Sequence, residues 1–106
     1  MPLSDLLMTD DSPSWVPDSF LALFVEPGQF KPNASRDAIQ QRYAFCDDLA
    51  TMLTDTARSR LWELRITEAD VLDRIHAGLT AGAIDITKEE ALWVRRRLAE
   101  LLGWHD

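Results

Sequence analysis

The stretch SRDAIQQRYAFCDDLATMLTDTAR, residues 35–58, decides which fold this chain can adopt. Its apolar side chains recur at steps of three and four residues, which is the spacing of one helix face. The positions on this stripe are Ile39, Tyr43, Cys46, Ala50, Leu53 and Ala57. Ser35 precedes the stripe and can accept a hydrogen bond from an amide of the first turn. The pattern therefore predicts a long amphipathic helix from Arg36 to about residue 58.

The end of this helix is less sharply marked than its start. Apolar density falls between Thr54 and Arg60, then returns at Leu61, Trp62 and Leu64. A bend, a helix boundary or a continuing helix would each fit such a dip, so the sequence leaves the end open.

Two contrasting segments precede the long helix. Pro17 stands at a favoured first-turn position before the apolar run FLALFV, residues 20–25, which predicts a short apolar helix. The connector 26–36 follows, with two prolines that fix φ and a glycine that permits a positive φ, so the chain must turn there. Phe30 and Lys31 neither cap nor end a helix, and we take them as candidate partner-binding residues.

Two further helices are predicted downstream by a repeated start signal. Ile66-Thr67-Glu68-Ala69-Asp70 and Ile86-Thr87-Lys88-Glu89-Glu90 each place a capping threonine three residues before an acid, which is the pattern of a capping box. Helices from 68 to 80 and from 88 to 102 follow. Gly82 and Gly103 stand just beyond them, where a left-handed residue often closes a helix.

Together these elements predict an all-α protein, an irregular or orthogonal bundle of four main helices. Residues 1–14 combine polar residues and two prolines with few apolar ones, so we expect a flexible, disordered N-terminal tail there. Residues 15–106 are expected to form a single helical domain, because 106 residues lie below the length at which cores usually divide.

Composition and charge narrow the class of protein. The net charge is −7: residues 1–35 hold five acids against Lys31 and residues 67–87 hold four acids against Arg74. Such a chain repels phosphate backbones, so nucleic-acid binding is disfavoured. The cluster Arg95-Arg96-Arg97 fans over about 200° of a helix and is better interpreted as a solvated face.

The expected compartment is the cytoplasm. No apolar run is long enough to span a bilayer, and the N-terminus lacks the pattern of a signal peptide. A single cysteine, Cys46, rules out an internal disulfide and agrees with a reducing compartment.

Few residues suggest chemistry. His76 has Asp73 three positions earlier, a spacing at which a carboxylate can orient an imidazole, but the second histidine, His105, lies at the chain end. A metal site would need distant carboxylates to join His76, so we assign no metal and no cofactor, and keep Asp73 and His76 as weak metal candidates. Cys46 is interpreted as a buried small apolar residue.

The four tryptophans divide into two groups. Trp62 and Trp93 lie within helical patterns and are expected in the core, whereas Trp15 and Trp104 flank helix ends. We take Trp15 and Trp104, with Phe30 and Lys31, as candidate partner-binding residues, because tryptophan supplies large contact areas at interfaces.

Residues 17–104 also resemble a family of small uncharacterised proteobacterial proteins. The resemblance is carried by Phe20–Phe24, Pro27-Gly28, Lys31-Pro32, Ala34-Ser35-Arg36, Arg42-Tyr43, Cys46–Ala50, Thr67–Leu72 and Arg97–Trp104. Some members bear the label "ATPase with chaperone activity", which implies an ATPase or a role beside one. No Gly-rich loop ending in Lys-Ser or Lys-Thr occurs here, so the motif for nucleotide hydrolysis is missing.

The function that fits these observations is a small cytoplasmic protein–protein interaction or adaptor module, accessory to a chaperone ATPase or self-associating as a homodimer. Its partner is expected to be a protein, with neither nucleic acid, membrane nor small-molecule substrate inferred. The alternative is a small enzyme or metal-binding protein that uses His76 with nearby carboxylates.

Overall fold

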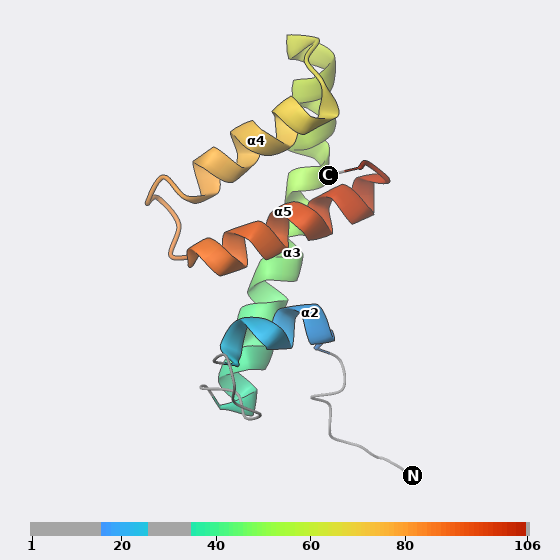
Figure 1. Ribbon diagram of the computed structural model, residues 1–106. Helices are drawn as coiled ribbons and strands as arrows, with labels where there is room; N and C mark the ends of the chain where they lie inside the picture. The colour runs from blue at the N-terminus through green and yellow to red at the C-terminus, as the bar shows by residue number, and fades with distance from the viewer. Residues whose placement is uncertain (1–15, 26–34, 106) are drawn as a thin grey trace. The chain divides into compact units, whose positions relative to one another are not determined.

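The described part of the chain consists of helices and the turns that join them. The computed structural model describes residues 16–25 and 35–105, and every regular element within these ranges is a helix (Figure 1). The predicted all-α class is confirmed. The expected tail at 1–14 lies outside the described residues.

The chain divides into two compact units, residues 1–43 and 44–106, and the boundary falls within the longest helix. Each unit is described by itself below. The sequence-based division at residue 15 stays a prediction.

The first unit holds a short apolar helical segment. Helix α2, Asp18–Leu21, continues as the 3₁₀ turn η2, Ala22–Phe24, and Pro17 stands at its N-cap with φ −67°. Phe20 is fully buried, and its ring centroid lies 5.5 Å from that of Phe24 and 5.6 Å from that of Tyr43. The predicted short helix is therefore present, and aromatic contacts hold it in this unit.

Helix α3, Arg36–Leu64, is the longest helix of the described residues and continues through residues 54–60, where apolar density falls. Ser35 Oγ accepts a hydrogen bond from the Ala38 amide at 3.1 Å, so the predicted cap forms. The dip does not break the helix because Ala57, a small residue, keeps the stripe buried at 0% exposure. The helix ends at Arg65, whose φ of 54° is left-handed.

Helices α4, Glu68–Leu79, and α5, Lys88–Leu102, pack side by side (Figure 1). At α5 the capping box is complete: Thr87 Oγ1 accepts from the Glu90 amide, and Glu90 Oε1 accepts from the Thr87 amide, both at 3.0 Å. At α4 the threonine half forms, with Thr67 Oγ1 accepting from the Asp70 amide at 3.1 Å. Both predicted helix starts are confirmed.

The two helix ends differ from each other. Gly103 adopts the left-handed conformation, with φ 74°, and closes α5 as predicted. Helix α4 instead ends at Leu79 with Thr80 as its C-cap, and Thr80 Oγ1 donates to the His76 carbonyl oxygen at 3.1 Å. Gly82 also has a positive φ, 100°, but it serves the following turn because the threonine has already closed the helix.

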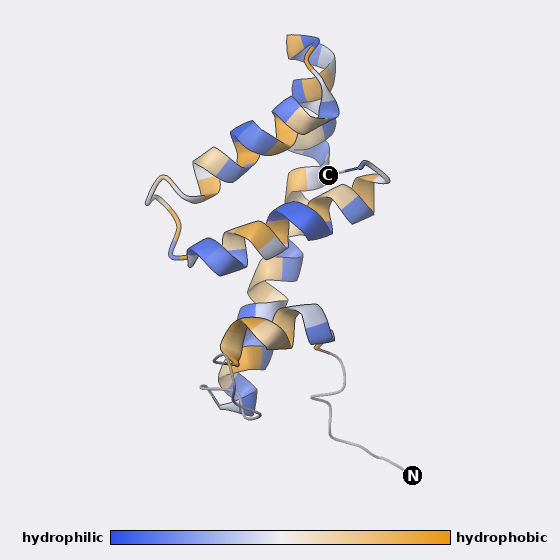
Figure 2. Cartoon of the chain, in the orientation of Figure 1, coloured by the Kyte–Doolittle hydropathy of each residue, from blue (hydrophilic) through white to orange (hydrophobic). Residues whose placement is uncertain are grey.

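The core of residues 44–106 is built from one face of each helix. Figure 2 shows hydrophobic and hydrophilic residues alternating along α4 and α5, as amphipathic helices require. The buried apolar residues are Cys46, Ala50 and Ala57 of α3, Val71, Leu72 and Leu79 of α4, and Ala91, Trp93, Val94, Leu98 and Ala99 of α5. Small residues dominate the α3 contribution, which lets its backbone lie close to its neighbours.

Candidate interaction site

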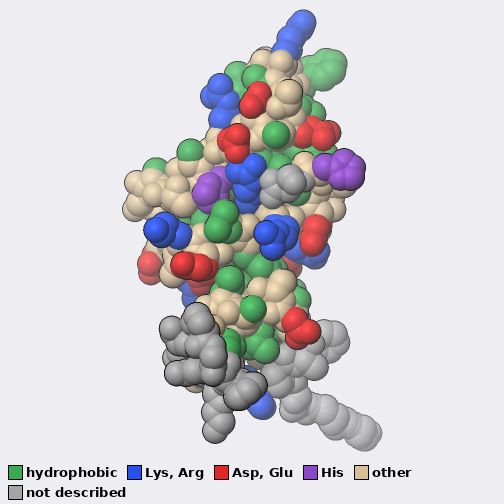
Figure 3. All heavy atoms as spheres, viewed as in Figure 1, with side chains coloured by type: hydrophobic (Ala, Val, Ile, Leu, Met, Phe, Trp, Pro, Cys, Tyr) green, Lys and Arg blue, Asp and Glu red, His purple; other side chains and the backbone are tan. Residues whose placement is uncertain are grey.

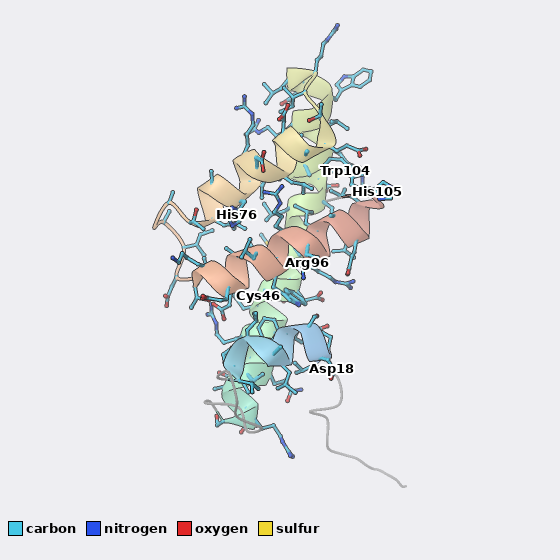
Figure 4. All side chains as sticks on the ribbon, viewed as in Figure 1. Asp18, Cys46, His76, Arg96, Trp104 and His105 are labelled. Atoms are coloured by element: carbon cyan, nitrogen blue, oxygen red, sulfur yellow. The ribbon has the colours of Figure 1, made fainter. Side chains whose placement is uncertain are left out.

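Most of the predicted partner-binding residues fall outside the described ranges. Trp15, Phe30 and Lys31 are among them, so their role stays a prediction. Trp104 is described: it is half-buried after α5, and its amide donates to the Ala99 carbonyl oxygen at 2.9 Å (Figure 4). This bond and the one from the Gly103 amide to the Glu100 carbonyl oxygen fix the backbone on which Trp104 sits.

The two tryptophans assigned to the core have opposite environments. Trp93 is 7% exposed, as predicted, whereas Trp62 is 84% exposed, so its assignment to the core was wrong. The reason is helix phase. Trp62 follows the buried Ala57 by five residues, which places it about 140° around α3 from the buried stripe. Counting from the stripe itself would have found this exposed tryptophan in the sequence.

Most of the exposed large apolar side chains among the described residues lie on α3. Besides Trp62, they are Phe45, Met52 and Leu64 on α3 and Leu92 on α5. Over α4 and α5, Figure 3 shows charged side chains of both signs around small hydrophobic areas. Trp62 is the most exposed of this group and supplies the largest contact area.

A groove of about 330 Å³ lies between the C-terminal half of α3 and helix α4. We call it the α3–α4 groove. The described residues that line it are Leu53, Thr56, Arg60 and Leu64 of α3, Arg74, Ile75, Gly78 and Leu79 of α4, and Ile84 after α4. Its lining is therefore aliphatic with two cations, and no acid occurs among these described residues.

The two arginines of the α3–α4 groove are weakly engaged within the chain. Arg60 Nη1 lies 3.4 Å from Glu63 Oε1, and both side chains are more than half exposed, so water screens this pair. Arg74 is exposed, and no salt bridge joins it to another residue in the described part of the chain. Both guanidinium groups can therefore meet an external anion.

The other arginine cluster has a structural role. Arg95 Nη1 lies 2.7 Å from Asp73 Oδ1, which links α5 to α4, and Arg97 Nε lies 2.9 Å from Asp47 Oδ1, which links α5 to α3. The Asp47 hydrogen bond raises the pKa of Arg97 above its usual value, and burial opposes that shift. Only Arg96 matches the predicted solvated face: it is exposed on α5 (Figure 4).

Asp73 forms an ion pair with Arg95 instead of the predicted pairing with His76. His76 Nε2 is buried and has no hydrogen-bond partner, while the Asp73 carboxylate is bound to Arg95. Among residues 16–25 and 35–105, no three His, Cys, Asp or Glu side chains form a group that could hold a metal ion. Figure 4 shows His76 on α4 well apart from His105, which is exposed after α5.

Cys46 lies where the stripe predicted it. Its side chain is fully buried on the core face of α3 (Figure 4). A thiol without solvent access has little opportunity to react, so Cys46 acts as a small apolar residue of the core.

Comparison with known proteins finds no matching family model, curated protein or solved structure. None of the helices in the described ranges is both long enough and apolar enough to cross a bilayer.

Proposed function

We propose that this chain is a small protein–protein interaction or adaptor module of the cytoplasm. The observation that carries the proposal is Trp62, which stands 84% exposed on the last two turns of α3. An exposed tryptophan keeps a large apolar area in water, and burial of this area against a partner would be strongly favourable. Tryptophan is also among the residues most enriched at interface hot spots.

The surroundings of Trp62 suit a contact surface. Leu61, Trp62 and Arg65 line a surface hollow, and Leu64, 44% exposed, follows on the same helix end. Arg58, one turn before Trp62, forms only a long, exposed pair with Asp55, at 3.7 Å. An aromatic anchor beside polar, solvated side chains is the arrangement found at the centre and rim of many interfaces.

The resemblance of residues 17–104 supports a more specific form of the proposal, in which the partner is a chaperone ATPase of a bacterial cell. Self-association as a homodimer is the second form. Trp104, half-buried after α5, is a further candidate contact residue in either form. Trp15, Phe30 and Lys31 stay candidate partner-binding residues on the grounds of the sequence alone.

Site-specific photocrosslinking in the native cell tests the proposal. A benzophenone amino acid replaces Trp62 in one variant and the exposed Arg96 of α5 in a matched control. We expect a protein adduct from position 62 and little or none from position 96. Mass spectrometry of the adduct distinguishes a chaperone ATPase from a second copy of the 12.1 kDa chain. If position 62 yields no more adduct than position 96, the proposal is wrong.

A further inference from the structure

We propose that the α3–α4 groove is the docking site for an amphipathic helix of a partner protein. The residues that flank the apolar face of this helix are acidic. This inference rests on the proposed function, because it names a second contact surface of the same module and the chemistry that the surface recognises. Three features carry it: the lining, the charge and a glycine.

The lining fits a row of aliphatic side chains. Leu53 and Leu64 contribute from α3, Ile75 and Leu79 from α4, and Ile84 from the segment that follows α4. A groove between two helices with such a lining accepts the apolar face of a third helix, whose anchors recur at three- and four-residue steps. The volume of about 330 Å³ accommodates several such side chains.

The charge selects an acidic partner. Arg60 and Arg74 border the groove, and its described lining contains no acid. Arg74 is also the only cation in residues 67–87, where four acids occur, yet no described salt bridge engages it. Guanidinium groups pair well with carboxylates, so these two arginines would attract acidic residues beside the apolar anchors of a partner helix.

A close approach of the partner helix explains why residue 78 is a glycine. Gly78 lies in the last turn of α4, and its backbone needs no positive φ. A Cβ built on Gly78 would have no neighbour within 4 Å, so nothing in the described chain requires a glycine there. Gly78 also lines the groove, and a bare backbone at this point lets a partner helix pack closely.

A displayed library of helices tests this assignment. Each 16-residue helix has leucine at positions 4, 7, 8 and 11, and its flanking positions vary among acidic, basic and neutral residues. Selection against the full chain is expected to enrich acidic flanks. Selection against the double variant Arg60→Glu, Arg74→Glu is expected to enrich basic flanks instead.

Gly78→Ala provides the decisive second variant. We expect it to raise the melting temperature of the free chain and, at the same time, to weaken binding of the selected acidic helices by tenfold or more. Arg74→Glu should weaken binding by at least as much. Arg96→Glu, an identical charge change on the exposed face of α5, should leave binding within twofold.

Several results would overturn the assignment. They are the recovery of no binding helix, the enrichment of neutral or basic flanks by the unaltered chain, and helices that bind equally well to the Gly78→Ala and Arg74→Glu variants. A dimer of the chain alone that Arg74→Glu dissociates would show that a second copy occupies the groove. The photocrosslink at position 62 is independent of the groove, so the failure of one experiment leaves the other interpretable.

Discussion

At the scale of single residues, burial separates side chains that have the same chemistry. Trp62 and Trp93 each follow a leucine within a helix, yet one is 84% and the other 7% exposed. Arg95 and Arg97 form ion pairs with other helices, while their neighbour Arg96 is exposed. Residue type therefore limits which contacts a side chain can make. Its position around the helix decides whether it contacts the core, another helix or water.

Truncation of the two tryptophans should show this difference directly. Trp93→Ala is expected to lower the free energy of unfolding by about 3–5 kcal/mol, because it leaves a cavity in the core. Trp62→Ala is expected to change it by no more than about 0.5 kcal/mol, because the side chain is already in water. Urea denaturation followed by circular dichroism measures both values. Similar losses for the two variants would contradict the assigned environments.

At the scale of helices, local signals fix the starts and tertiary packing fixes the extents. The hydroxyls of Ser35, Thr67 and Thr87 all form the capping bonds that their sequence positions predicted. The length of α3 could not be predicted in the same way, because residues 54–60 contain few apolar side chains and only the structure shows that Ala57 is fully buried there.

The two capping threonines should contribute unequally to stability. Thr87→Ala is expected to cost about 1 kcal/mol, and Thr67→Ala less. The Thr87 bond is part-buried and belongs to a complete capping box, so its loss leaves the Glu90 amide with little access to water. The Thr67 bond is exposed, and water can replace the hydroxyl. Thermal unfolding of both variants measures the difference, and an equal or reversed order would refute it.

The Arg97–Asp47 pair should couple α5 to α3 by a modest amount. A double-mutant cycle with Arg97→Met and Asp47→Asn is expected to give about 0.5–1 kcal/mol, because both side chains remain about one third exposed. Added salt should reduce this coupling, since ions screen exposed charges. A coupling energy near zero at low salt would show that the hydrogen bond at 2.9 Å adds nothing to stability.

The pH dependence of the pair follows from the raised pKa of Arg97. A cation whose pKa is higher in the folded state stabilises the fold at every pH below its unfolded pKa, and the stabilisation is lost as the pH rises through the folded value. Arg97 protonation should therefore leave the unfolding free energy constant between about pH 6 and about pH 9. The difference in unfolding free energy between the unaltered chain and Arg97→Met measures the contribution of Arg97 over this range. A decline of that difference towards pH 9 would contradict the prediction.

At the scale of the whole molecule, the chain contains two compact units, and the one at residues 44–106 has a substantial core of its own. Leu72 of α4 and Val94 and Leu98 of α5 are fully buried within it. Both proposed contact surfaces, Trp62 with its neighbours and the α3–α4 groove, also belong to this unit.

A fragment of residues 44–106 should therefore keep its helices and unfold cooperatively. Its ion pairs between helices are formed within residues 44–106 and the unit is compact, so we expect a sigmoidal thermal transition by circular dichroism. The selected acidic helices should bind it about as well as they bind the full chain. A gradual, non-cooperative loss of helix would show that residues 1–43 are needed for this core.

The sequence by itself determined the all-α class, the positions of the helix starts, the buried stripe of α3 through Cys46 and Ala50, and the left-handed end at Gly103. These features depend on local backbone chemistry and on helical periodicity, which any reader of the chain can count. Tertiary structure alone decided which acids meet Arg95 and Arg97, and that Leu53 and Arg60 of α3 border one groove with Arg74 and Gly78 of α4. Such features depend on residues far apart in the chain, and helical periodicity cannot specify which of them meet.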